Sequence, residues 1–329
     1  MAKVIRIKPI GGLGNRMFQY LLARVLQEVA PDAIITGYYL PEFGLIASDA
    51  ESNEEAVYRS EIIIRGHVFP FKATVGALRY SRDALVRIEW LCMRMEYFRH
   101  HLNLASIIFP INPNLKTGFD SRFLVIHIRT AAARRGLHPH PNYTLLPLAW
   151  YRHLIASSEL EPVFLGEIGD NAYCDALRTQ FPEARFVTNE NPLDDFNILR
   201  TSKNLVISVS SFSWLAAWLS ISAEQIVLPI AGLFNPLDRP DVDLLPIHDR
   251  RYHFYHFPQE VWVGSGEQLA AKIVGPGNFC AVCAPRIFRG WAAMQISLAG
   301  RRPNGLSLLR DLKAVLPNRS RDCLAYSGL

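Results

Sequence analysis

The sequence predicts an α/β protein of two domains, with parallel strands and helices on both faces of the sheet. The chain has 329 residues, more than one hydrophobic core usually fills, so two domains are expected. Half of the residues are apolar and a fifth are charged, which is typical of a globular protein. Short apolar runs alternate with helical segments of about ten residues, an order typical of βαβ units.

The first domain begins with a strand and a helix joined by glycines. Val4–Ile10 alternates apolar and basic residues, and apolar residues then recur at helical spacing from Met17 to Val29. Ala33–Tyr39 is expected to be the next strand. The strongest later helix signal covers residues 77–104, where apolar positions share one face and arginines lie on the other.

A proline-containing stretch at about residues 110–121 separates the domains, so we expect an α/β domain over 1–117 and a doubly wound domain over 118–329. After Pro229 the periodicity weakens, and residues 235–262 are expected to form a structured loop or a flap that faces a partner. The second domain is predicted to have strands at 123–129, 162–166, 185–188, 205–209 and 225–229, and helices at 147–157, 171–180, 192–201 and 212–219.

Charge and cysteine content limit the function classes. The net charge of +5 suits an anionic ligand, but no ladder of aromatic and basic residues predicts nucleic-acid binding. Five cysteines with one close pair, Cys280 and Cys283, favour a reducing cytoplasm over a disulfide framework. That pair could belong to a zinc site, although no second pair follows, or be two free thiols.

The chain has no run of about twenty apolar residues, so any contact with a membrane is expected to be peripheral. Residues 286–329 are rich in arginine and poor in acidic residues. This basic C-terminal region could touch the inner membrane, or it could be a solvated surface helix with a frayed end. We expect a cytoplasmic protein in either case.

The glycines at Gly11, Gly12 and Gly14 lie between the first strand and the first helix. Glycine lets a ligand approach the backbone, and a helix N-terminus offers N–H groups to an anion. Their spacing is neither G-x-G-x-x-G nor that of a P-loop. Taken alone, the motif is therefore either a phosphate-binding turn or only a tight turn.

Polar residues follow two predicted strands of the second domain. His127 and Arg129 end the strand at 123–129 and project to the same face, where open α/β sheets bind ligands. An arginine there would bind a phosphate or a diphosphate, or it would form a structural ion pair. Ser210, Ser211 and Ser213 lie between a strand and a helix, a pattern that favours an anion site over simple helix capping.

Three segments together resemble a known family: GGLGNRMFQY at 11–20, VIHIR at 125–129 and SVSSFSWLAAWL at 208–219. In order and spacing they are similar to the α-1,2-fucosyltransferases. The resemblance implies a GT-B fold, in which two Rossmann-like domains face a cleft, with the first domain on the acceptor side and the second binding the nucleotide sugar. It also implies a metal-independent, inverting transfer of fucose from GDP-fucose to a glycan hydroxyl, with no cofactor.

The same resemblance implies roles for individual residues. Arg129 would bind the diphosphate and stabilise the leaving group, and His127 would shape the same pocket. Asn15, with Gly12 and Gly14, would line the cleft from the first domain near the sugar. Glu167 would contact the guanine edge. The phosphates and nucleoside would be held by Ser210, Ser211, Phe212 and Ser213, and Arg16 is a further candidate for donor binding.

The chain departs from the family pattern after Arg129, where Thr130-Ala131-Ala132 replaces Arg-Gly-Asp, and at Arg16, where glutamine is usual. These departures leave open a GT-B transferase with another nucleotide sugar, or a degenerate homologue that binds the nucleotide without turnover. The general base is also open among Glu42, His127 and Asp170.

Overall fold

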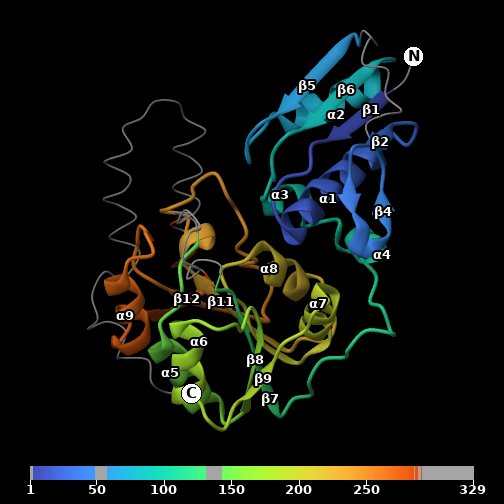
Figure 1. Ribbon diagram of the computed structural model, residues 1–329. Coiled ribbons are helices and arrows are strands. Elements are labelled where there is room, and N and C mark those ends of the chain that lie inside the picture. The colour runs from blue at the N-terminus through green and yellow to red at the C-terminus, as the bar shows by residue number, and fades with distance from the viewer. Residues whose placement is uncertain (1–2, 49–57, 131–142, 285, 288–289, 291–329) are drawn as a thin grey trace, which may run out of the picture. The chain divides into compact units, whose positions relative to one another are not determined.

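The computed structural model describes residues 3–48, 58–130, 143–284, 286–287 and 290 (Figure 1). The chain forms two compact units; the first runs to Ile111 and includes Asp241–Leu244, and the second begins at Asn112. The second unit takes the residues just before 118 because the Lys116 amide donates to Asp194 Oδ1 (3.0 Å) and the Gly118 amide donates to Thr201 Oγ1 (2.7 Å). The boundary thus precedes residue 117, the predicted end of the first domain.

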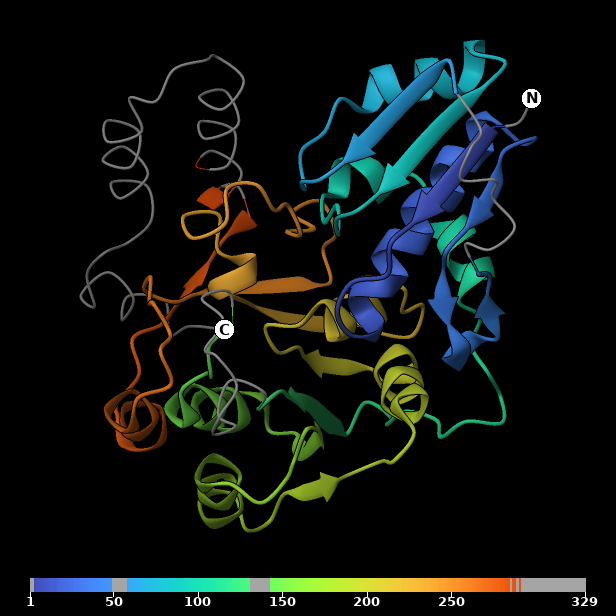
Figure 2. The same cartoon turned by 45° about the horizontal axis from the view of Figure 1, so that its top comes forward.

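The first unit is built on a parallel sheet of four strands in the order β2-β1-β6-β5 (Figure 2). α1 follows β1 and α2 precedes β6, and the two helices pack against each other. The bounds are β1 Lys3–Ile7, α1 Leu13–Val29, β2 Ile34–Thr36, β5 Ser60–Ile64, α2 Phe71–Tyr80 and β6 Ala84–Ile88. The first strand and first helix are where the sequence predicts them.

The central strands bury one face of this sheet fully and the other in part, since Val4 and Leu85 are buried on the second face. Ile5 on β1 and Val86 on β6 are paired and fully buried. They lie on the face of the sheet that can cover the apolar side of α1. Arg6 and Arg87, also paired, lie on the opposite face and are partly exposed. α1 and α2 contact β1 and β6 respectively. Right-handed β1-α1-β2 and α2-β6 connections place both helices on the buried face.

The long helix predicted over residues 77–104 is wrong. α2 ends at Tyr80, residues 84–88 form the buried strand β6, and two short helices follow, α3 Met95–Phe98 and α4 Leu102–Ile108. The apolar residues that fitted a helical stripe also fit a central strand, and pairing with β1 and β5 on both sides decides the outcome. A small hairpin, β3 Tyr39–Leu40 and β4 Leu45–Ile46, joins around the 3₁₀ turn η1 Pro41–Phe43.

The second unit is a seven-stranded sheet in the order β13-β12-β11-β10-β7-β8-β9, in which β13 alone is antiparallel within the described residues. Six of the strands have the doubly wound Rossmann order. The bounds are β7 Phe123–Ile128, α5 Leu148–Ser158, β8 Glu161–Gly166, α6 Ala172–Gln180, β9 Arg185–Val187, α7 Pro192–Thr201, β10 Asn204–Val206, α8 Ser211–Trp218, β11 Gln225–Ile230, β12 Tyr252–His256, α9 Gly266–Val274 and β13 Cys280–Val282.

Helices cover both faces of this sheet. α7 and α8 pack together on one face, and α9 contacts α5 and α6 on the other, as Figure 1 shows. The elements predicted between residues 123 and 230 are confirmed, with ends that differ by at most three residues. Two Rossmann-like α/β units in succession confirm the predicted fold class, GT-B; the cleft between the domains stays a prediction.

The expectation that residues 235–262 form only a loop or flap is wrong in one part. β12 lies inside this stretch and extends the sheet beside β11, in parallel register from Ile226 and Tyr252 onward. The sequence signal was weak because the strand is short and a polar residue, His256, takes one of its three inward positions. The 3₁₀ turn η4 Gly232–Phe234 lies between the two strands.

Most of the basic C-terminal region lies outside the described residues, so its predicted membrane contact stays a prediction. In the part of the chain that is described, none of the helices combines the length and the apolar character that crossing a bilayer requires.

Candidate functional site

The predicted site residues of the second unit lie at the switch point of its sheet. β7 and β10 are neighbours, and from them the chain continues in opposite directions, through β8 and β9 on one side and through β11 and β12 on the other. Ligands of open α/β sheets bind in the crevice that such a reversal leaves at the carboxyl ends of the strands. Arg129 directly follows β7, and Ser208 and Ser210 follow β10.

Arg129 is partly buried at this crevice, between a hydroxyl and an aromatic ring. Its Nη1 donates to Ser210 Oγ at 3.3 Å, and its guanidinium carbon lies 4.6 Å from the centre of the Tyr143 ring. Nε is buried and has no hydrogen-bond partner among the described residues. Since a guanidinium carries five donors, most of its capacity for an anion is unused by these contacts.

His127 is the buried residue of β7 that lies two positions before Arg129. Its Nδ1 is 2.7 Å from Ser208 Oγ, and only 5% of the residue is exposed. Burial, and next the charge of Arg129, lower the pKa of His127 to about 3. The imidazole is therefore neutral at pH 7. His127 contacts Ser208 and Arg129 contacts Ser210, so both side chains meet the segment after β10. His127 is buried, and its predicted role at the site stays a prediction.

The serines after β10 have two different environments. Ser210 is the N-cap of α8. Its Oγ accepts hydrogen bonds from the Phe212 amide and from Arg129 Nη1, both at 3.3 Å. Ser213 Oγ donates to the backbone oxygens of Ser208 (3.2 Å) and Ser210 (3.3 Å), so its hydroxyl is engaged inside the protein. Ser211 is also buried. A phosphate could therefore use the α8 N-terminus and Ser210 more readily than Ser213.

The Phe212 ring packs inward. Its centroid lies 6.0 Å from that of His127 and 5.3 Å from that of Phe196 on α7. Phe212 thus fixes α8 against the strand ends. Its predicted role in holding the nucleoside stays a prediction, and in this structure the ring has a packing role.

Glu167 and Thr130 join the ends of β8 and β7. The Thr130 amide donates to Glu167 Oε2 at 3.0 Å, and Thr130 Oγ1 donates to the Glu167 backbone oxygen at 2.9 Å. The Glu167 amide in turn donates to the Ile128 backbone oxygen at 2.9 Å. The threonine that departs from the family pattern therefore has a clear structural role. The role of Glu167 at a guanine edge is untested and stays a prediction.

Gly166 permits the close approach of these strand ends. Its φ is +111°, and a Cβ there would lie 2.6 Å from the Ile128 backbone oxygen and 3.0 Å from His127 Nε2. Side chains larger than hydrogen would push β8 away from the residues that carry the site. Nothing along the chain marks this glycine, because the requirement comes from the neighbouring strand.

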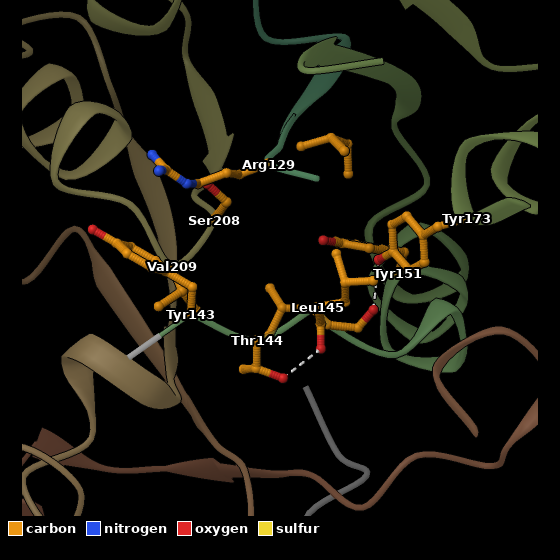
Figure 3. Close-up of a pocket in the computed structure, with 10 residues that line it drawn as sticks. Arg129, Tyr143, Thr144, Leu145, Tyr151, Tyr173, Ser208 and Val209 are labelled. Carbon is orange, nitrogen blue, oxygen red and sulfur yellow. Dashed lines mark hydrogen bonds between the residues drawn. The ribbon is translucent and has the colours of Figure 1, made fainter. Parts of the chain in front are cut away.

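A small cavity lies beside Arg129, and Figure 3 shows the Arg129, Tyr143 and Val209 side chains at one side of it and Tyr151 and Tyr173 at the other. Its volume is about 10 Å³, room for about one water molecule. A diphosphate would thus bind at the open side of Arg129 and not inside this cavity. The cavity is lined by Ile128, Arg129, Tyr143, Thr144, Leu145, Leu146, Tyr151, Tyr173, Ser208 and Val209.

The glycine turn of the first unit is held by a residue that the sequence interpretation missed. Gln19, fully buried on α1, accepts from the Ile10 amide at 3.0 Å and donates to the Lys8 backbone oxygen at 2.8 Å. Gly11 has a φ of +74°, and a Cβ there would be 2.4 Å from Asn15 Nδ2. The motif is therefore at least a braced tight turn, in which Asn15 folds back toward Gly11.

Gly12 and Gly14 begin α1 in different ways. Gly12 is the N-cap and offers no side chain, so no side-chain group caps the first turn, and Gly14 is buried within that turn. This is the arrangement in which helix N–H groups can meet an anion or a sugar hydroxyl. The predicted binding roles of Gly12, Gly14 and Asn15 are not tested and stay predictions.

Arg16 is held within the first unit. Its Nη1 donates to the Tyr39 backbone oxygen and its Nη2 to Glu42 Oε1, both at 2.7 Å. The pair is mostly buried, with 16% of the Arg16 side chain and 21% of the Glu42 side chain exposed. Glu42 is thus charge-paired, which makes it a weaker candidate for a general base, and Arg16 is largely neutralised where it lies.

The described residues include no group of three or more His, Cys, Asp or Glu side chains placed to hold a metal ion. Cys280 on β13 is buried and Cys283 is exposed. The expectation of a metal-independent protein stays a prediction.

Comparison with known proteins gives no family. No protein-family model matches the chain, and no curated protein matches it. Solved structures are similar to it at low identity. The E. coli heptosyltransferase WaaC, solved with ADP, is 11% identical, with a TM-score of 0.40 over 89% of this chain and 99% of that one.

The iron-containing dodecameric glycosyltransferase TibC of enterotoxigenic E. coli is 12% identical, with a TM-score of 0.35 over 69% of this chain. The chain spans 58% of the length of TibC. With such TM-scores these likenesses add nothing to what the strand order shows.

Proposed function

We propose that this protein is a glycosyltransferase that binds the diphosphate of a nucleotide sugar at the switch point of its second unit. The observation that carries the proposal is the contact between Arg129 Nη1 and Ser210 Oγ at the N-cap of α8. It places a fixed cation, a hydroxyl and a helix N-terminus on one spot of the sheet edge. Each of the three attracts an oxyanion, and together they suit a diphosphate.

In this proposal the bond between the sugar carbon and the diphosphate oxygen breaks while an acceptor hydroxyl oxygen bonds to that carbon, and the hydroxyl proton passes to solvent water. Negative charge grows on the leaving diphosphate. Arg129 and the α8 N–H groups would stabilise that charge, and the half-buried Tyr143 ring packs against the guanidinium. A metal ion is not needed for this step.

The donor that we propose is GDP-fucose, with inversion and an α-1,2 linkage to a glycan hydroxyl, because the three motifs resemble enzymes with that reaction. The motif residues that differ, Thr130 and Arg16, are engaged in structural contacts here. A transferase with another nucleotide sugar is the second candidate, since these two positions lack the family's usual residues.

The test compares Arg129→Ala with Arg122→Ala. Arg122 lies at the other end of β7, pairs with Asp120 and has 72% of its side chain exposed, so it is a matched control. Purified proteins are incubated with GDP-fucose and other nucleotide sugars plus a panel of glycans, and the released nucleoside diphosphate is measured. We expect Arg129→Ala to reduce turnover roughly 100-fold or more and Arg122→Ala to leave it unchanged.

Normal turnover by a folded Arg129→Ala variant would overturn the assignment of Arg129. Thermal stabilisation of the wild type by GDP with no release in the presence of any acceptor would instead identify a nucleotide-binding protein without transferase activity.

A further inference from the structure

A second cavity of about 320 Å³ lies in the second unit, over the carboxyl ends of β11 and β12. Ala231 and Gly232 follow β11, Phe257 follows β12, and helix α9 contributes Ala271 and Lys272. The volume is in the range of small-molecule sites. The carboxyl edge of an open sheet is also where ligands bind, on either side of the switch point. No residue of the diphosphate site proposed above, neither Arg129 nor Ser210, lines it.

The segment after Tyr143 connects this cavity to the Arg129 site. Thr144, Leu145 and Leu146 line both cavities. Tyr143 lies under the Arg129 guanidinium, and Thr144 Oγ1, one residue on, donates to Glu260 Oε2 at 3.0 Å. Residues 144–146 therefore form a wall that the two cavities share, one residue away from the Tyr143 ring that contacts Arg129.

The walls of the larger cavity suit a neutral ring and do not suit a phosphate. Pro147, Phe257 and Pro276 give it apolar surface. Its charges cancel, because Lys272 Nζ lies 2.5 Å from Glu260 Oε2. A phosphate needs surplus positive charge or several N–H donors, which this pair does not supply.

Glu260 keeps one acceptor available. Both hydrogen bonds to its carboxylate, from Thr144 and from Lys272, reach Oε2, and in the described part of the chain Oε1 accepts none. A carboxylate oxygen in a mostly apolar pocket is a selective partner for ligand O–H or N–H groups, since leaving it unpaired against an apolar ligand costs binding free energy.

We propose that this cavity binds the uncharged, hydroxyl-bearing ring attached to the diphosphate, with Glu260 Oε1 accepting from its hydroxyl or N–H groups. The inference rests on the proposed function, because it takes the diphosphate to lie against Arg129. The ring has two sources, the nucleoside or the donor sugar, and the two share this chemistry.

The test is isothermal titration calorimetry of the full chain with GDP, ADP, UDP and GDP-fucose. Two variants alter the cavity: Glu260→Gln removes the charged acceptor, and Ala271→Leu fills the space. Ala270→Leu is the matched control on the same helix, since Ala270 is exposed and does not line the cavity. Thermal unfolding of each variant verifies that it is folded.

We expect both cavity variants to weaken binding roughly tenfold and the control to stay within about twofold. Equal losses for a nucleoside diphosphate and its nucleotide sugar identify the nucleoside as the occupant; a loss for GDP-fucose alone identifies the sugar. One outcome would overturn the cavity proposal alone: the wild type binds a nucleotide, Arg129→Ala weakens that binding, and neither cavity variant weakens it. The proposed function would then stand. A wild type that binds none of the four ligands contradicts the proposed function, and the cavity proposal with it.

Discussion

The imidazole Nδ1 of His127 and the hydroxyl of Ser208 lie 2.7 Å apart, and this contact joins the end of β7 to the loop after β10. Ser208 Oγ is also 3.3 Å from Ser213 Oγ in α8. The buried pair thus determines where the Arg129 strand end and the α8 N-terminus meet. Ser213 Oγ in turn donates to the backbone oxygens of Ser208 and Ser210, so the strand ends are joined by a buried hydrogen-bond network.

Removal of the Ser208 hydroxyl should destabilise the second unit. Ser208→Ala leaves the buried His127 Nδ1 without this partner, which should lower the free energy of unfolding by about 1–3 kcal/mol. Urea unfolding at pH 7.5 measures it. Ser157→Ala is the control, because Ser157 is exposed on α5 and should change stability by less than about 0.5 kcal/mol. Equal effects of the two substitutions would contradict the importance of the His127 contact.

Gly166 should be far less tolerant of alanine than Gly169, three residues later. At Gly166 a Cβ meets backbone at 2.6 Å and φ is +111°, whereas at Gly169 nothing lies within 4 Å. Gly166→Ala should therefore lower the melting temperature and cost more than about 1 kcal/mol, and Gly169→Ala should be nearly neutral. Differential scanning calorimetry of the two variants makes the comparison. A neutral Gly166→Ala would show that β8 can move away from Ile128 at little cost.

Stability should fall in mild acid because of two buried histidines. Burial lowers the pKa of His127 to about 3 and that of His256 to about 4, against 6.5 for an ordinary histidine. Below about pH 6.5 the unfolded chain therefore binds more protons than the native one, and stability is lost as the pH falls toward these values. At pH 5 each histidine should account for about 2 kcal/mol.

His256→Leu separates this effect from the Arg129 site. His256 Nε2 is buried and has no hydrogen-bond partner among the described residues, so leucine should be tolerated. Urea unfolding at pH 7.5 and at pH 5.0 should show a smaller loss of stability in the variant than in the wild type. The same loss in both proteins would rule out His256 as a source of the acid sensitivity.

Glu167 offers a test between two roles. Its carboxylate accepts from the Thr130 amide, so Glu167→Ala should weaken every nucleoside diphosphate to a similar degree, by displacing the strand end that carries Arg129. A carboxylate that contacts guanine would instead give a loss for GDP that UDP does not share. Titration of both ligands into the variant distinguishes the roles. Glu161→Ala, at the exposed opposite end of β8, is the control.

The second unit shows which elements of the fold can be predicted from the local sequence pattern. The strand runs at 123–129 and 205–209 and their polar ends are visible in the sequence because short apolar runs between helices have few alternative structures. The same reasoning failed for residues 84–88, where a buried strand and a helical stripe require similar residues and only pairing with β1 and β5 decides.

The sequence by itself determined the α/β class, the strand ends that carry Arg129 and Ser210, and the serine N-cap of the helix that follows, because each depends on neighbours along the chain. Tertiary structure alone decided that Glu167 supports Thr130, that Glu42 neutralises Arg16, and that Tyr143 and Thr144 join two cavities. These contacts depend on strand order and on side-chain packing between segments that are distant in the chain. The local sequence pattern therefore does not predict which of these residues meet.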